Sequence, residues 1–188
     1  MRHTLGDDQK DLEVYFESDE EFNLYSYKSK SGKYIIISSG KTISDEIRFV
    51  SADNPYEKFK VFQNRVDGLE YSVNHLKDKW YIRTNIDDSK NFKLMMCSES
   101  VTSSKNWKEF IKHRDNVLLE GVEIFDDFMV ITERENGQRR FNVISNKNGQ
   151  NHYIDFEEEA FSTYSSVNIE INSSKFRYGY SSMTTPNS

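Results

Sequence analysis

The sequence predicts an all-β chain that forms part of a β-propeller. A short pattern, a turn followed by an apolar run led by an aromatic residue, occurs four times; the aromatic residues are Tyr34, Trp80, Phe128 and Phe176. They are spaced at intervals of 46, 48 and 48 residues. A period in the upper forties built from short strands is typical of propeller blades. Because no segment keeps a 3.6-residue apolar period over three turns, we expect little helix.

Each complete repeat contains four predicted strands that form an antiparallel meander. In the first repeat they are Phe22–Tyr27, Tyr34–Ser38, Asp45–Val50 and Phe59–Phe62. In the second they are Glu70–Leu76, Lys79–Thr84, Phe92–Cys97 and Trp107–Ile111. In the third they are Leu118–Phe125, Phe128–Glu133, Arg140–Ile144 and His152–Phe156. The second strand of each repeat is dense in apolar residues, as expected for a sheet that packs on both faces.

The two ends of the chain are predicted to belong to incomplete blades. We expect Leu12–Phe16 to be the outer strand of a preceding blade. A further blade should begin with the strands Val167–Ile171 and Phe176–Ser182. Between them, Phe156–Tyr164 is the best candidate for a single helical turn.

The repeats define five segments of one partial propeller domain. These are the end of a blade at 1–21, complete blades at 22–66, 67–115 and 116–160, and the start of another at 161–188. About three and a half repeats do not close a ring, and two apolar sheet faces would be left uncovered. We therefore expect two copies to pair face to face as a homodimer.

Composition excludes several classes of function. The 188 residues carry a net charge of −6 and no basic stripe, so we expect no nucleic-acid partner. Aromatic residues make up 14%, which argues against disorder. No apolar run has the length of a membrane span, so we expect no membrane partner. The single cysteine, Cys97, excludes an internal disulfide and resembles a buried strand thiol. It favours a reducing compartment, the cytoplasm, with the periplasm left open.

Two short motifs resemble catalytic sequences but lack essential positions. Gly40-Lys41-Thr42 ends like a phosphate-binding loop, yet Ile35 stands where that loop needs its first glycine, and a strand follows in place of a helix. The segment 179–183 begins like the nucleophile motif G-x-S-x-G, with Ser181 in the place of the serine. Met183 stands where the closing glycine of that motif should be. We interpret the first as a hairpin turn and the second as a strand.

No catalytic, cofactor or metal site is predicted. The histidines, His3, His75, His113 and His152, are scattered, and no two of them have ligand spacing on one element. The acidic runs Glu17–Glu21 and Asp155–Glu159 are expected to be solvated loops. As an alternative, acidic loops at a propeller rim attract basic peptides.

One string near the C-terminus resembles a known family. Phe176–Pro186, and within it the run from Tyr178 to Pro186 (YGYSSMTTP), resembles the oligopeptidase B branch, also called protease II, of the prolyl oligopeptidase family of serine peptidases. Supporting matches run in the same order along the chain, at 2–6, 70–72, 90–92 and 118–121. Only the C-terminal string is specific.

The resemblance implies a seven-bladed propeller that caps a catalytic α/β-hydrolase domain and admits short peptides, cut after Arg or Lys. The Ser-Asp-His triad would lie in the hydrolase domain, so the resemblance assigns no catalytic residue here and this segment by itself should be inactive. Its implied partners are short basic peptides, the remaining half of the propeller and the hydrolase domain. Blade geometry suggests that Tyr25, Tyr71 and Glu123, on the first strand of each blade, face a central channel.

Two other classes remain as alternatives. A free-standing, non-catalytic propeller would serve as a protein-interaction scaffold, distinguished by the absence of a downstream hydrolase domain in its gene. A nucleotide-binding enzyme built on Gly40-Lys41-Thr42 is disfavoured by Ile35 and the missing helix.

Overall fold

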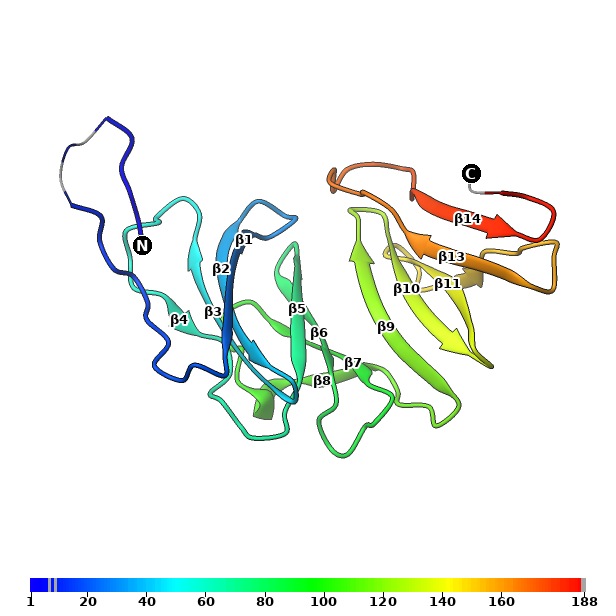
Figure 1. Cartoon of the computed structure of the whole chain (residues 1–188), viewed down its shortest axis with the longest axis horizontal. Coiled ribbons are helices and arrows are strands. Elements are labelled where there is room, and N and C mark those ends of the chain that lie inside the picture. The colour runs from blue at the N-terminus through cyan, green and yellow to red at the C-terminus, as the bar shows by residue number, and fades with distance from the viewer. Residues whose placement is uncertain (7, 9, 187–188) are drawn as a thin grey trace. The chain divides into compact units, whose positions relative to one another are not determined.

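The structure is a computed structural model that describes residues 1–6, 8 and 10–186. Strands dominate it, as Figure 1 shows, and the helix within the described residues is limited to the three-residue 3-10 helix η1 (Ser104–Asn106). The chain divides into two compact units, residues 1–69 and residues 70–188. Within the described part, no helix is long and apolar enough to cross a membrane.

The first unit contains one antiparallel sheet in the order β1-β2-β3-β4. Its strands are β1 (Asn23–Lys28), β2 (Tyr34–Lys41), β3 (Ser44–Ser51) and β4 (Lys60–Val61). The hairpin between β2 and β3 has a two-residue loop, because Lys41 pairs with Ser44. Ile36 and Ile47, on the two middle strands, and Phe62, directly after β4, are almost completely buried and belong to the core of this unit.

The second unit begins with the antiparallel sheet β5-β6-β7-β8. Its strands are β5 (Tyr71–Leu76), β6 (Lys79–Thr84), β7 (Lys93–Ser98) and β8 (Lys108–Ile111). Lys77 adopts a positive φ of 57° in the tight turn between β5 and β6. Trp80 and Ile82 alternate with exposed or half-buried neighbours on β6 and are completely buried, which is the period-two pattern of a strand.

The third sheet, in the order β12-β11-β10-β9, is also antiparallel. Its strands are β9 (Val117–Ile124), β10 (Phe128–Glu135), β11 (Gln138–Ser145) and β12 (Asn151–Tyr153). The register shifts by one residue between β9 and β10: Thr132 pairs with Gly121, whereas Glu133 pairs with Leu119. Glu120 is therefore the extra residue of a β-bulge.

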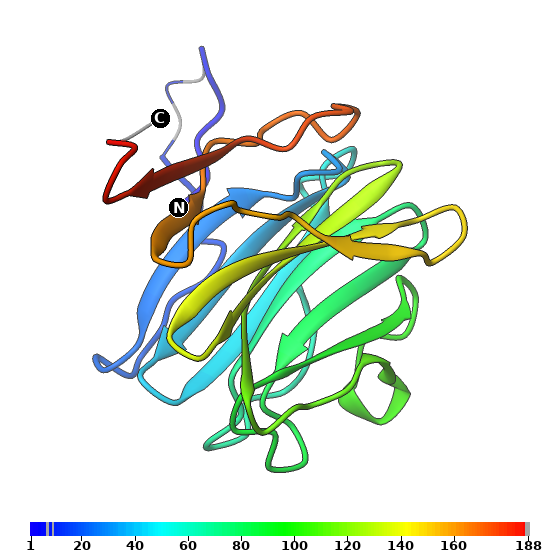
Figure 2. The ribbon, with the colours of Figure 1, turned by 90° about the vertical axis from the view of Figure 1, so that its right-hand side faces the viewer.

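A two-stranded hairpin completes the second unit. Its strands are β13 (Phe161–Ser165) and β14 (Tyr178–Ser182), and β13 lies beside β11 (Figures 1 and 2). A long loop joins the two strands, and Asn168 holds this loop by accepting a hydrogen bond from the Arg177 backbone N–H and donating to the Arg177 carbonyl.

Two apolar clusters join neighbouring sheets inside the second unit. One joins the sheet β5–β8 to the sheet β9–β12 through residues such as Leu94, Leu119 and Ile131. The other contains Phe125 and Phe141 and continues into the aromatic residues near the hairpin. Inside the second unit, neighbouring sheets thus bury side chains against each other, which is how propeller blades form a core.

The structure confirms the all-β class and the four-stranded antiparallel sheets. Three local predictions were wrong. Leu12–Phe16 is not a strand, because it contributes only the bridge between Leu12 and Arg2. Val167–Ile171 lies in the loop, and the strand that pairs with β14 is Phe161–Ser165. Phe156–Tyr164 contains bends and the start of β13 where a helical turn was expected.

Candidate functional site

The Gly40-Lys41-Thr42 motif lies at a hairpin. Gly40 and Lys41 end β2, and β3 begins only two residues after Lys41. The Gly40 Cα lies so close to the Asp45 carboxylate that a methyl group there would be 2.5 Å from Oδ1. A carboxylate at this position and the absence of a following helix leave no cradle for phosphate.

Ser181 is a strand residue that pairs with Ser162 across the β13–β14 hairpin. A nucleophile elbow needs a sharp turn from a strand into a helix, and here the strand continues to Ser182. Ser181 therefore lies in a paired strand and not at such an elbow.

The four histidines lie apart, and three of them contact separate local partners. His3 pairs with Asp11, and His75 is 1% exposed, with Nε2 3.1 Å from Glu99 Oε2. His113 Nε2 accepts the backbone N–H of Asn91 at 3.2 Å, and His152 lies on β12. Among the described residues, no group of three or more His, Cys, Asp or Glu side chains is arranged to hold a metal.

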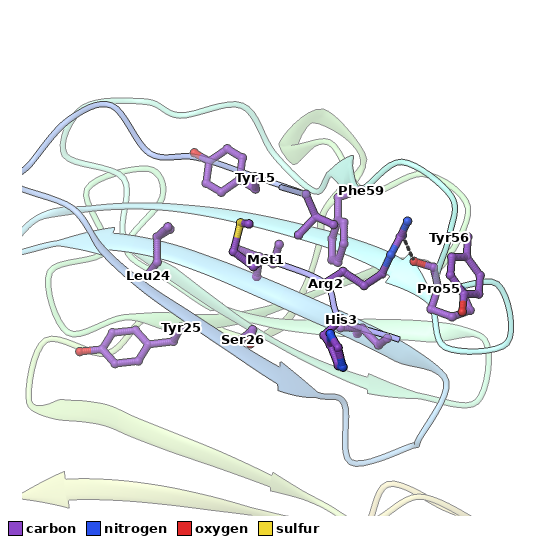
Figure 3. Close-up of a pocket in the computed structure, with 13 residues that line it drawn as sticks. Met1, Arg2, His3, Tyr15, Leu24, Tyr25, Ser26, Pro55, Tyr56 and Phe59 are labelled. Carbon is purple, nitrogen blue, oxygen red and sulfur yellow. Dashed lines mark hydrogen bonds between the residues drawn. The ribbon is translucent and has the colours of Figure 1, made fainter. Parts of the chain in front are cut away.

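A hollow in the first unit is lined by residues of β1 and β2, by the N-terminal segment and by the segment before β4 (Figure 3). It has a volume of about 420 Å³, and Leu24, Ile35 and Ile37 form part of its wall. Arg2 Nη1 donates to the Pro55 carbonyl at 3.0 Å, and its guanidinium lies 4.6 Å from the centroid of the Tyr56 ring. The hollow thus combines apolar side chains with an Arg2 guanidinium that already has partners.

A network of charged and hydroxyl groups lies next to this hollow. Glu17 accepts hydrogen bonds from Arg65, from Ser39 at 2.7 Å and from the Tyr15 hydroxyl at 2.8 Å. The Arg65 guanidinium, followed by the hydroxyl groups, lowers the pKa of Glu17 to about 2. Arg65 also lies 3.7 Å from the Phe22 ring centroid. The expectation that the run Glu17–Glu21 is solvated was therefore wrong for Glu17, whose side chain is 8% exposed.

A second hollow, of about 460 Å³, lies in the second unit and contains part of the acidic run Asp155–Glu159. Its wall combines carboxylates with the rings of Phe156, Tyr178 and Tyr180. Glu158 Oε1 accepts the hydroxyl of Ser182 at 2.5 Å and that of Thr184 at 2.8 Å, and these hydrogen bonds lower the pKa of Glu158. Glu158 thus fastens the segment after β14, while attraction of basic peptides by this run stays a prediction.

The three residues predicted to face a channel have different environments. Tyr25 is 66% exposed, and Glu123 is half-buried on β9. Tyr71 is buried, and its ring packs 5.6 Å from that of Trp107. Tyr71 is therefore part of a packed core and not a channel residue.

Comparison with known proteins gives these sheets a family. The family model described as "Prolyl oligopeptidase, N-terminal beta-propeller domain" matches residues 1–188. The chain belongs to this family. This membership explains the spacing of the four-stranded sheets and the resemblance of the YGYSSMTTP string.

Curated relatives within the prolyl oligopeptidase family are peptidases. "Dipeptidyl aminopeptidase BI" of Pseudoxanthomonas mexicana is 40% identical over 98% of this chain and 25% of its own length. "Protease 2" of Moraxella lacunata is 30% identical over 98% of this chain and 26% of its own length. The chain therefore spans about a quarter of the length of these relatives.

Solved structures of oligopeptidase B share the fold. The enzyme of Leishmania major superposes with a TM-score of 0.91 at 22% identity, over 98% of this chain and 28% of the other. The enzyme of Trypanosoma brucei gives a TM-score of 0.88 at 24% identity, again over 98% of this chain and 28% of the other. These similarities confirm that the sheets are propeller blades.

Proposed function

We propose that this chain is part of the propeller of a serine oligopeptidase and controls which peptides reach a catalytic domain elsewhere in the protein. The observation that supports the proposal is the match of the propeller-domain model to residues 1–188. The described residues fit a non-catalytic role, because the motifs that resemble catalytic sequences lie in a hairpin and in a paired strand.

The physical basis of this role is a size limit. Packed sheets over an active site exclude folded proteins, and flexible short peptides enter when the cover opens. The substrates we propose are short basic peptides, cut after Arg or Lys. The acidic net charge of −6 is suited to attracting them. The hydrolase domain and the other blades of the ring would be the structural partners of this segment.

The proposal is tested with the 188-residue chain and with a longer gene product that contains it. The chain alone should not hydrolyse a fluorogenic Arg substrate above the buffer rate. The longer product should cut a series of single-Arg peptides of 5 to 60 residues with a kcat/KM that falls steeply with length. A matched series of peptides that were denatured in advance serves as the control for folding of the longer peptides. Equal kcat/KM values at all peptide lengths would exclude the size limit.

A second candidate activity is the removal of dipeptides from a free amino terminus. The relative named for such an activity is 40% identical, against 30% for "Protease 2". The two activities differ in their need for a free amine. Acetylation of the peptide amino terminus should abolish hydrolysis by a dipeptidyl aminopeptidase and leave an oligopeptidase active.

The alternative of a non-catalytic interaction scaffold is tested with the same longer gene product. A longer product without a hydrolase domain, and with no activity on either peptide form, would favour the scaffold. A product that is labelled covalently by a serine-directed phosphonate would favour the peptidase.

A further inference from the structure

The chain direction distinguishes the two ends of each sheet. We call the end at which the first strand of a sheet begins its first end, and the opposite end its second end; the first strands are β1, β5, β9 and β13. Because neighbouring strands are antiparallel, the first end carries the hairpin between the second and third strands and the connections to other sheets. The second end carries the other hairpins.

In the first unit, the acidic side chains gather at the first end. Five acidic side chains and one basic side chain, a net charge of −4, lie in the segments at that end: 17–22, 42–43 and 62–69. Two acidic and three basic side chains, a net charge of +1, lie in the segments at the second end: 29–33 and 52–59. The two ends of this sheet therefore differ in the sign of their charge.

The second unit, taken by itself, has the same polarity. Eight acidic and three basic side chains, a net charge of −5, lie in the segments at its first end: 70, 85–92, 112–116, 136–137, 154–160 and 183–186. Five acidic and five basic side chains, which cancel, lie in the segments at its second end: 77–78, 99–107, 125–127, 146–150 and 166–177. The polarity thus occurs twice, in two units with different loop sequences.

The arginines near the first end of β10 and β11 do not cancel this charge. Arg134 and Arg139 both bind the carboxylate of Glu120, and Arg140 binds Glu135. Three guanidinium groups are therefore held by two carboxylates of the same sheet, and together they add a single positive charge to that end.

The propeller fold gives this polarity a direction. Blades repeat around the channel with the same chain direction, so the first ends of the blades in a ring belong to one face. A face of one charge sign raises the local concentration of ligands of the opposite sign and the rate at which they associate. Such exposed charges act over about 30 Å at about 0.01 M salt and over about 3 Å at about 1 M salt.

We propose that short basic peptides approach these blades from the face formed by the first ends, and that the face formed by the second ends does not attract them. The inference rests on the proposed function, since the peptides are its proposed substrates. It adds the side of approach, which the net charge of the whole chain does not specify.

The first test uses the 188-residue chain and an acetylated triarginine amide that carries a nitroxide label. The relaxation enhancement of amide protons in 17–22 and 154–160 should exceed that in 29–33 and 166–177 at least about threefold at about 0.01 M salt. The preference should disappear at about 1 M salt. The control peptide has citrulline in place of arginine, which keeps the size and removes the charge, and it should show no preference.

Two triple variants change the net charge by the same amount at opposite ends, and all six side chains are exposed. The first-end triple variant neutralises three carboxylates: Asp88→Asn, Asp115→Asn and Glu157→Gln. The second-end triple variant does the same with Asp53→Asn, Glu57→Gln and Asp126→Asn. Only the first-end variant should lower the enhancement in 154–160, by at least about twofold. Circular dichroism must show that both variants keep the fold of the parent.

The longer gene product connects the surface to hydrolysis. At low salt, the first-end triple variant should lower kcat/KM for an Arg peptide of net charge +3 more than for one of net charge zero, while the second-end variant should match the parent on both. The labelled-peptide experiment involves no hydrolysis, so a longer product without peptidase activity would contradict the proposed function without affecting the result on the chain.

Three results would overturn the inference: equal relaxation enhancement at the two ends with the arginine peptide at low salt, the same preference with the citrulline peptide, or an equal loss of enhancement in the two triple variants. A greater enhancement at the second ends would assign the approach of basic peptides to the opposite face and would likewise overturn it.

Discussion

Arg65 Nη2 lies 2.5 Å from Glu17 Oε2 and ties the segment before β1 to the segment after β4, 48 residues away. Glu17 is 8% exposed and Arg65 29%, so water screens the pair less than it screens a surface pair. Ser39 and Tyr15 complete the hydrogen bonds of the carboxylate. The segment before the first complete blade is therefore fastened by a network and not by strand pairing.

Replacement of Glu17 by Gln should loosen this segment. The variant keeps the size of the side chain but removes the charge that Arg65 faces, so the stability of the first unit should fall. Hydrogen exchange of residues 12–19 should accelerate more than exchange in β6. Glu13→Gln serves as the control, because Glu13 is exposed in the same segment. Unchanged exchange in the Glu17 variant would contradict the fastening role.

Glu17 should also contribute to acid unfolding. Its pKa is lowered to about 2 from an ordinary value of 4.5, so the folded state binds its proton later than the unfolded state does. The stabilisation is complete above pH 4.5 and is lost as the pH falls toward 2. The melting temperature of the parent minus that of Glu17→Gln should therefore shrink between pH 5 and pH 2. A difference that stays constant over this range would contradict the assigned pKa.

Removal of a second buried carboxylate, that of Glu133, should lower the free energy of unfolding more than removal of an exposed one. Glu133 is 2% exposed, and it accepts hydrogen bonds from Arg114 and, at 2.8 Å, from the Tyr153 hydroxyl. Glu133→Ala should lower the free energy of unfolding by about 3 kcal/mol, because it removes a buried carboxylate and leaves the half-buried Arg114 and Tyr153 donors without their acceptor. Glu170→Ala breaks the exposed pair with Arg177 and should cost at most about 1 kcal/mol. Urea unfolding measures both, and equal losses would contradict the importance of burial.

Gly179 provides a test of packing inside the YGYSSMTTP string. It pairs with Tyr164 across the hairpin, and a methyl group at Gly179 would lie 2.3 Å from Tyr164 Cζ. Gly179→Ala should therefore displace the ring and cost about 1 kcal/mol. In a Tyr164→Ala background the same substitution should cost less, which a double-mutant cycle by urea unfolding measures. An equal cost in both backgrounds would exclude the contact as the cause.

The single thiol should be unreactive in the folded chain. Cys97 is buried, and burial raises its pKa to about 11, so about one thiol in a thousand is ionised at pH 8. Reaction with Ellman's reagent should be slow in buffer and should give one equivalent at once in denaturant. A fast reaction in buffer would show that β7 opens readily.

The sheets were predictable because their signal is local. Aromatic-led apolar runs such as those beginning at Tyr34 and Phe128 alternate with turn residues, and burial of both sheet faces leaves this mark in the sequence. Strand ends differed by one to three residues at several places, because the strand pairing that decides them is not local. The wrong strand at Val167–Ile171 has a clear cause: its apolar residues alternate, but Asn168 holds the loop with its amide group and Val167 and Ile169 remain exposed.

The polar networks were not predictable, because their partners are distant in sequence. Glu17 lies within an acidic run that has the composition of a solvated loop, and no nearby residue indicates that Arg65 is its partner. The same holds for Glu133 and Arg114, 19 residues apart. What the sequence could indicate was the absence of paired catalytic motifs, since the missing glycines at Ile35 and Met183 are visible without coordinates.

The one-residue bulge at Glu120 divides β9 into two halves. Without the extra residue, the side chains of one half would face the opposite side of the sheet. The Glu120 carboxylate accepts Nε–H groups from both Arg134, at 2.6 Å, and Arg139, at 2.5 Å. Deleting this residue would make the ladder continuous but would turn Val117 and Leu119 from the interior to the opposite side of the sheet. Lineages of this fold should therefore tolerate exchange of the amino acid here far better than a change in the number of residues.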